Sequence, residues 1–276
     1  VKGVVTSTAV DRILRDIGDQ ELLGKLLELP RSDLNSLLLE LFNRLAGKTT
    51  PTDILKAYQC NRFSIPSKAE PSKFYSLEAE LTDAAKRAGM QTVLLSPSAP
   101  LGSCSSFGYV SQNNVVSAAR GTETLSDPSN MLAIIIADKL RNNTESNRSP
   151  LHYAATARVV RAQAFSGKGF YSHFGVFCIV SSGKDSGSYI CEKELLTRQL
   201  IYYKELFFNK YNASISIVLR QRGGYADGNG FFTSIADVIE TVLPDVPVSL
   251  ETTHEENGYS KGSNFQIYMA HNTDKS

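Results

Sequence analysis

The stretch LHYAATARVVRAQAFSGKGFYSHFGVFCIVSSGKD, residues 151–185, decides the fold that the sequence predicts. Its two arms, residues 153–165 and 170–180, are rich in Val, Phe, Tyr and Thr, and a small, glycine-rich tip separates them. β-Branched and aromatic residues favour strands, and glycine favours a tight connection between them. We therefore predict two antiparallel strands joined by a short loop.

Polar side chains near the tip of this hairpin form the first candidate site. Residues two apart in a strand point to one face, so Arg161 lies beside Gln163 on the first arm. By the same rule His173, Gly175 and Phe177 share a face of the second arm. We predict that the hairpin presents the guanidinium, the amide, the imidazole and the ring side by side. An ordinary hairpin, with Arg161 in solvent and Phe177 in a core, also fits this pattern.

The spacing of these residues resembles the second signature motif of class II aminoacyl-tRNA synthetases. In that family the motif is an antiparallel hairpin whose Arg contacts the α-phosphate of ATP and whose Phe stacks on adenine. The resemblance implies that Mg²⁺ and ATP are the cofactors, with Arg161 on the phosphate and Phe177 under the purine. His173 stands four residues before Phe177, and Gln163 stands where the family usually has Glu.

Length and composition indicate an ordinary globular protein. The chain has 276 residues, 42% of them hydrophobic, which is enough for one large domain with an appendage or for two small domains. The formal net charge is only +1, so no overall basic field supports nucleic-acid binding. We therefore expect no nucleic-acid partner.

The cysteines and the apolar segments suggest a location in the cell. The four cysteines show no metal-ligand spacing, which favours free thiols in the cytoplasm over a disulfide framework or a zinc site. They are Cys60, Cys104, Cys178 and Cys191. No apolar run is long enough to cross a bilayer, and the first residues lack a secretion pattern, so we expect no membrane association.

The first 60 residues are predicted to form a helical N-terminal extension. Apolar residues recur at helical spacing in residues 10–17, 22–27 and 32–45, with Ser32 as the expected N-cap of the third helix, and a short helix starts at Pro51. A leucine stripe on the third helix predicts packing against a core, and a docking module is the alternative. Residues 61–75 are predicted to be an extended linker to the main domain, residues 76–276.

The main domain is predicted to begin with a helix from Ser76 to Gly89, followed by a strand over residues 91–95 and by Pro97. Helix, glycine, strand and proline in this order resemble the first class II motif. In the family that motif lies at a dimer interface, so the resemblance implies a homodimer.

A helix is predicted to follow Asp127 and Pro128, with Glu123 just upstream in the sequence RGTETLSDPSNMLA. In histidyl-tRNA synthetases and their regulatory paralogues, an Arg-Pro-Glu/Asp-x-Thr turn leads into a helix at this place. The turn carboxylate helps to hold the amino group of the substrate, which makes Glu123 a candidate substrate-binding residue. A solvent-facing acid in a turn is the plain alternative.

After the hairpin the pattern predicts a helix over residues 192–209, a strand over 213–220, a helix over 233–243, and strands over 246–252 and 264–271. Arg220 and Arg222 stand at the end of the first of these strands, where such a sheet could face a ligand. They are candidates for a second cation near the substrate.

The sequence EENGYSKGSNFQIYM resembles the histidine-binding turn of histidyl-tRNA synthetases, with Tyr259, Gly262 and Phe265 in matching places. The leading Arg of that turn has no counterpart, and acidic residues occupy its region. The third class II motif, a glycine-rich turn with an Arg, and the anticodon-binding domain have no counterpart before Ser276. We therefore expect a protein that does not charge tRNA.

The predicted fold class is α+β, a mostly antiparallel sheet flanked by helices as in class II synthetases and biotin ligases, with a helical N-terminal extension. The predicted function is a non-charging class II paralogue that binds a small ligand, a nucleotide or an amino acid, in a binding or regulatory role. It would act as a homodimer and with a protein partner. The alternatives are an ATP-dependent ligase that activates a carboxylate and an assembly subunit without a ligand.

Overall fold

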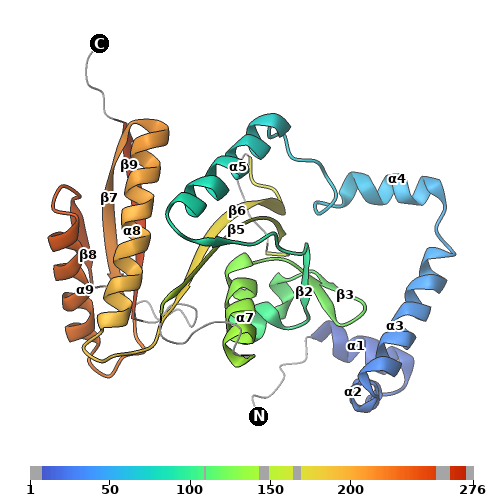
Figure 1. Cartoon of the computed structure of the whole chain (residues 1–276). Helices are drawn as coiled ribbons and strands as arrows, with labels where there is room; N and C mark the ends of the chain where they lie inside the picture. The colour runs from blue at the N-terminus through green and yellow to red at the C-terminus, as the bar shows by residue number, and fades with distance from the viewer. Residues whose placement is uncertain (1–7, 109, 143–148, 164–168, 253–261, 272–276) are drawn as a thin grey trace.

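The computed structural model describes residues 8–108, 110–142, 149–163, 169–252 and 262–271. In these residues the chain forms an N-terminal helical arm and a main body with three three-stranded sheets. We call the sheets A (order β1-β5-β6), B (order β2-β4-β3) and C (order β8-β7-β9). Sheet C with its helices and the helical arm lie on opposite sides of the molecule (Figure 1).

The arm contains four helices, as the apolar spacing predicts. They are α1 (Thr8–Ile17), α2 (Leu22–Glu28), α3 (Arg31–Ala46) and α4 (Pro51–Cys60). Helix α4 starts with a capping box between Thr50 and Asp53. Ser32 is not the N-cap of α3, because the helix already begins at Arg31 and Pro30 occupies the cap position.

The leucine stripe of α3 is not buried in the described part of the chain. Helix α3 has no buried residue, and the side chains of Leu37, Leu41 and Leu45 are exposed. The prediction that the stripe packs against a core is therefore wrong for this structure. Intrinsic periodicity predicts which residues share a face of a helix, but it does not say what covers that face.

The linker, residues 61–70, is shorter than predicted, because α5 (Pro71–Arg87) begins five residues before Ser76. The Glu70 carboxylate caps the helix by accepting hydrogen bonds from the backbone N–H groups of Ser72 and Lys73. Pro71 at the first helical position fits this start, since its missing N–H has no partner there in any helix.

Sheet A contains the predicted hairpin. Strands β5 (Leu151–Val160) and β6 (His173–Ser182) pair antiparallel, and β1 (Gln91–Thr92) pairs parallel with β5. Helix α7 (Pro128–Arg141) packs on one face through Leu132 and Ile136, and α5 and α8 (Ile190–Tyr211) pack on the other. Asp127 caps α7, as predicted.

Sheet B is small and supports the loop that precedes α7. It consists of β2 (Ser98–Pro100), β3 (Ser117–Ala118) and β4 (Thr122–Thr124). The short helices α6 (Ser103–Phe107) and η1 (Gln112–Asn114) lie in the connection between β2 and β3.

Sheet C lies across α8 from sheet A, since Leu200 packs on sheet C and Tyr202 packs on sheet A. It consists of β7 (Ala213–Gln221), β8 (Val248–Glu251) and β9 (Ser263–His271), and α9 (Gly228–Val242) completes its core. Four of the six strand pairings in the described residues are antiparallel, which agrees with the predicted α+β class. None of the described helices combines the length and the apolar character that a membrane span requires.

Candidate functional site

The hairpin register separates the predicted site residues. Arg158 pairs with Gly175 and Val160 pairs with His173, so even-numbered residues of β5 share a face with odd-numbered residues of β6. Arg161 is an odd-numbered residue just after β5, so its side chain points away from the face that carries Phe177. The prediction that the guanidinium and the ring lie side by side is wrong. Apolar alternation defines the faces of each strand, whereas the register between strands depends on the turn.

Arg161 is held at the end of β5. Its Nε donates a hydrogen bond to the carbonyl oxygen of Ser126 at 2.9 Å, and its guanidinium lies 5.2 Å from the centre of the Phe174 ring. Gln163 is exposed, and its backbone carbonyl accepts a hydrogen bond of 3.2 Å from Arg62. Arg161 and Gln163 thus both lie beyond the last residue of β5.

Phe177 is partly buried and packs against the core. Its ring stacks on Tyr202 of α8, with the ring centres 5.9 Å apart, and it packs with Ala85, Met90 and Ala154. This is the plain alternative that the sequence left open. A purine does not fit between Phe177 and Tyr202, because the two rings are already in stacking contact.

A pocket of about 940 Å³ opens at the end of the hairpin, between the linker, the first turn of α5 and the ends of β5 and β6. We call it the hairpin-end pocket. Its cationic and aromatic lining residues are Lys68, Phe74, Tyr75, Arg158, Arg161, Phe170, Tyr171, His173 and Phe174. No carboxylate is among the described residues that line it. Three cations beside aromatic rings favour an anionic ligand that carries a ring.

His173 fixes the position of Arg158 in this pocket. Its Nδ1 lies 2.7 Å from Nη2 of Arg158, and its Nε2 lies 2.7 Å from the carbonyl oxygen of Ile65. A guanidinium only donates and a carbonyl only accepts, so the ring accepts at Nδ1 and donates at Nε2. The hydrogen-bond partners therefore assign the neutral tautomer with the proton on Nε2.

The linker is tied to the hairpin by several further hydrogen bonds. Arg62 donates to Oγ of Ser172 at 2.7 Å and to the carbonyl oxygen of Ala162. The backbone N–H of Lys68 donates to the Tyr171 hydroxyl at 3.2 Å. These contacts hold the linker as one wall of the hairpin-end pocket.

Gly175 lets the helix α5 approach the hairpin. A Cβ atom at this position would lie 2.6 Å from Cε2 of Phe74, which is closer than real Cβ contacts allow. The Arg158 guanidinium lies 5.8 Å from the centre of the same Phe74 ring. Glu78, one turn further along α5, has a pKa above its usual value because burial outweighs the opposing effect of Arg158.

Glu123 is fully buried, with 1% of its surface exposed, and its carboxylate anchors the loop after β2. It accepts hydrogen bonds from the backbone N–H groups of Gly102 at 2.8 Å and Cys104 at 3.0 Å, and from the Gln112 amide at 2.9 Å. Both oxygens thus already have protein partners. The role of Glu123 toward a substrate amino group stays a prediction.

A chain of contacts connects Glu123 with Arg161. Cys104 donates its N–H to Glu123, and its Sγ lies 2.7 Å from Oγ of Ser126. The carbonyl oxygen of Ser126 then accepts from Arg161. Burial raises the pKa of the Cys104 thiol, so this thiol is a neutral, structural group. The two predicted residues belong to one polar network, although their charged groups are not in direct contact.

The remaining candidates lie on sheet C. Arg220 forms an ion pair with Glu251 on the neighbouring strand β8, and this pair raises the pKa of the guanidinium. The backbone N–H of Arg222 donates to the carbonyl oxygen of Gly262 at 2.8 Å. Tyr259 lies outside the described residues. Since α8 stands between sheets A and C, the structure does not bring Arg220 to the hairpin-end pocket beside Arg161.

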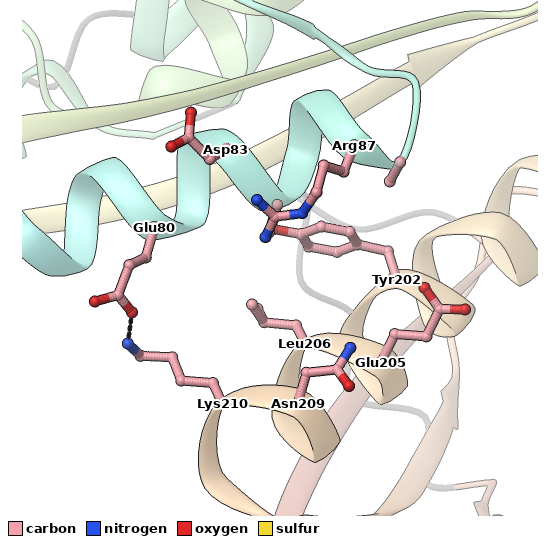
Figure 2. Close-up of a pocket in the computed structure, with 10 residues that line it drawn as sticks. Glu80, Asp83, Arg87, Tyr202, Glu205, Leu206, Asn209 and Lys210 are labelled. Atoms are coloured by element: carbon pink, nitrogen blue, oxygen red, sulfur yellow. Dashed lines mark ion pairs between the residues drawn. The ribbon is translucent and has the colours of Figure 1, made fainter.

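A second groove, of about 380 Å³, lies between α5 and α8. Figure 2 shows the ion pair of Glu80 with Lys210 on its rim and the Tyr202 ring in its wall. Three carboxylates and two cations line this groove, so its charge favours no anion. The hairpin-end pocket is therefore the stronger candidate for a ligand site.

Several residues of the hairpin-end pocket were not predicted, among them Lys68, Phe74, Arg158 and Phe174. Arg158 stands three residues before Arg161, and the alternation places the two on opposite faces. The sequence shows a basic residue, Arg158, on the first arm of the hairpin. Only the register between β5 and β6 shows that its side chain meets His173.

Solved structures resemble this fold, whereas no protein-family model and no curated protein matches the sequence. A protein described as a threonyl-tRNA synthetase from Aeropyrum pernix is similar with a TM-score of 0.55 and 11% identity, over 71% of this chain and 46% of that one. The ATP phosphoribosyltransferase regulatory subunit/histidyl-tRNA synthetase of Bacillus halodurans C is similar with a TM-score of 0.54 and 11% identity, over 75% and 71%. The fold is class II aminoacyl-tRNA synthetase-like.

The apo histidyl-tRNA synthetase of S. aureus is also similar, with a TM-score of 0.51 and 12% identity, over 74% of this chain and 55% of that one. The chain thus spans about half the length of the two named synthetases. Such low identity shows the fold alone, and the chemistry has to be argued from the side chains.

Proposed function

We propose that this class II synthetase-like chain binds a small anionic ligand with an aromatic ring, a nucleotide, in the hairpin-end pocket and acts in a binding or regulatory role. One observation carries this proposal: Lys68, Arg158 and Arg161 line, together with aromatic residues, a pocket that no described carboxylate lines. A guanidinium pairs with phosphate oxygens, and an aromatic ring stacks on a base.

The geometry supports binding more than adenylation. The predicted ligase uses Arg220 or Arg222 as a second cation on the transferring phosphate beside Arg161, and removal of such a contact typically costs about 2 to 4 kcal/mol in the transition state. Arg220 belongs to β7 of sheet C and is already paired with Glu251, and Arg222 directly follows the same strand. An amino acid is the second ligand class, because its carboxylate is also an anionic group that these cations would bind.

A cytoplasmic location and a protein partner are part of the proposal. All four cysteines are free thiols, which suits a reducing compartment. One of the similar proteins is an ATP phosphoribosyltransferase regulatory subunit/histidyl-tRNA synthetase, and a protein partner for this chain would agree with such a role. Mg²⁺ would enter only with a bound nucleotide.

The test is calorimetric titration with Mg-ATP, AMP and inorganic phosphate, with mixed amino acids present or absent. We expect the wild type to bind a nucleotide and Arg158→Ala to lose about tenfold or more in affinity, because a charge-assisted hydrogen bond is lost. Arg158 is the better target than Arg161, since the latter also supports Ser126.

The matched control is Arg44→Ala, which removes an arginine on α3 outside the hairpin-end pocket. Its affinity should equal that of the wild type. No heat from any of the three phosphate compounds in the wild type would overturn the nucleotide proposal. An equal loss of affinity in both variants would show a general charge effect and would overturn the assignment of the site to the hairpin-end pocket.

A further inference from the structure

Strand β6 lies at an open edge of sheet A. The order β1-β5-β6 leaves one side of β6 without a neighbouring strand among the described residues. An edge strand presents a row of backbone N–H and C=O groups that another strand can pair with. The backbone groups of β6 that do not point toward β5 therefore form the edge to which a further strand could pair.

The register identifies the outward-facing groups. The backbone N–H of Arg161 donates to the carbonyl oxygen of Ser172 at 2.8 Å, so these two residues form a hydrogen-bonded pair. Such pairs alternate along an antiparallel ladder, which directs the even-numbered residues of β6 toward β5. The backbone groups of the odd-numbered residues consequently point away from the sheet. These are His173, Gly175, Phe177, Ile179 and Ser181.

Exposure and composition agree with a usable edge. Helices pack on both faces of β6, yet nine of its ten residues are half-buried and Gly175 is exposed. By contrast, the first five residues of the central strand β5 are all buried. The sequence HFGVFCIVSS contains no Lys, Arg, Asp, Glu or Pro, which are the residues that usually protect an edge from pairing.

We propose that β6 pairs antiparallel with β6 of a second copy of this chain, so that two A sheets join into one continuous sheet. A two-fold axis makes identical strands antiparallel, and a strand without charges does not repel its own copy. With the axis at Phe177, His173 lies opposite Ser181 of the second copy, and Gly175 lies opposite Ile179. Each of these outward-facing pairs exchanges two backbone hydrogen bonds.

This surface differs from the helix α5, where the class II resemblance implies a dimer. It also affects the hairpin-end pocket, because His173 at the pocket would lie next to Ser181 of the second copy. The proposal does not depend on a ligand in that pocket. Failure of nucleotide binding and failure of dimerisation are therefore separate results.

The test compares Ser181→Pro with Ser181→Ala by sedimentation over a range of protein concentrations. Both variants lose the Ser181 hydroxyl, which contacts His152 and Gln199, so any effect of that loss is shared. Only proline removes the outward N–H and places a ring on the edge, while the ladder with β5 keeps its bonds. We expect a dimer for wild type and Ser181→Ala, and a dissociation constant at least about tenfold higher for Ser181→Pro.

Residue-resolved amide exchange gives a second readout. In the dimer the amides of the five odd-numbered residues should become protected, whereas those of the even-numbered residues are protected at every concentration. A monomeric wild type at high concentration would overturn the proposal. So would a dimer in which the odd-numbered amides stay unprotected, since the contact would then lie elsewhere. If the odd-numbered amides were protected in a monomer, another strand would cover this edge, and that result would also overturn the proposal.

Discussion

The two faces of strand β6 carry two phenylalanines with different surroundings. Phe177 faces α5 and α8 and stacks on Tyr202 in the core. Phe174 faces the other way, beside Arg161 and the hairpin-end pocket. The sequence motif drew attention to Phe177, but the register gives Phe174 the position next to the cation. A shift of one residue in alternation thus exchanges a residue that packs against the core for one that faces the pocket.

The largest effect is expected from Phe177→Ala. Truncation of a core phenylalanine leaves a cavity beside Tyr202, and we expect the free energy of unfolding to fall by about 3 kcal/mol. Chemical denaturation followed by circular dichroism measures this loss. If Phe177 instead supported a purine, stability would change little and nucleotide affinity would fall.

Phe174→Ala is the matched substitution on the other face. It removes the same side chain from the same strand, so the two variants differ mainly in which face is altered. Both side chains are partly buried, but Phe174 lies beside Arg161 and the hairpin-end pocket whereas Phe177 stacks on Tyr202, so we expect a smaller loss of stability, about 1 to 2 kcal/mol. A larger loss than in Phe177→Ala would reverse the assignment of core and pocket faces.

Gly175→Ala tests the contact between the hairpin and α5 on the Phe177 face. The added Cβ would lie 2.6 Å from Cε2 of Phe74, so the ring or the helix has to move. Overpacking of this kind typically costs about 1 to 3 kcal/mol in the free energy of unfolding. Thermal or chemical denaturation of the variant measures it.

A double-mutant cycle with Phe74→Ala isolates that contact. In the Phe74→Ala background the added methyl group has space, and Gly175→Ala should cost less than about 1 kcal/mol. Equal costs in both backgrounds would show that the alanine acts on the strand itself and not through the ring of Phe74.

Local patterns predicted most elements of this fold. The stripe of α7 and its cap at Asp127, the start of α4 at Pro51 and the two arms of the hairpin are all encoded within a few residues. Helix α5 begins five residues before the predicted start at Ser76, because Glu70, which is not among the residue types usually preferred at an N-cap, caps it.

The candidate site was harder to predict, since it depends on contacts far apart in the sequence. His173 joins Arg158 to the carbonyl of Ile65, more than a hundred residues away. Such a pairing needs the register of the hairpin and the path of the linker together. Likewise, the periodicity of α3 showed an apolar face but not that Leu41 and Leu45 are exposed.

The smallest effect concerns Cys178, which lies on the Phe174 side of β6 and packs with the residues around α7. Burial raises the pKa of its thiol from 9.0 to about 12. Between these values the unfolded chain loses the proton while the folded chain keeps it, so the free energy of unfolding falls as the pH rises. From pH 8 to pH 10 we expect this thiol to contribute a loss of about 1 kcal/mol, measured by urea denaturation at both values.

Cys178→Val removes the titrating group and keeps an apolar side chain in the same place. Its stability should therefore fall less than that of the wild type between pH 8 and pH 10. Cys60→Val, at the exposed end of α4, should follow the wild type. Burial also raises the pKa of Tyr203 to about 12, and Cys178 adds to this increase, so the difference between Cys178→Val and the wild type reports the thiol together with its effect on Tyr203. Identical slopes for Cys178→Val and the wild type would mean that this side of β6 is open to solvent, and the two faces of the strand would then differ less than their phenylalanines indicate.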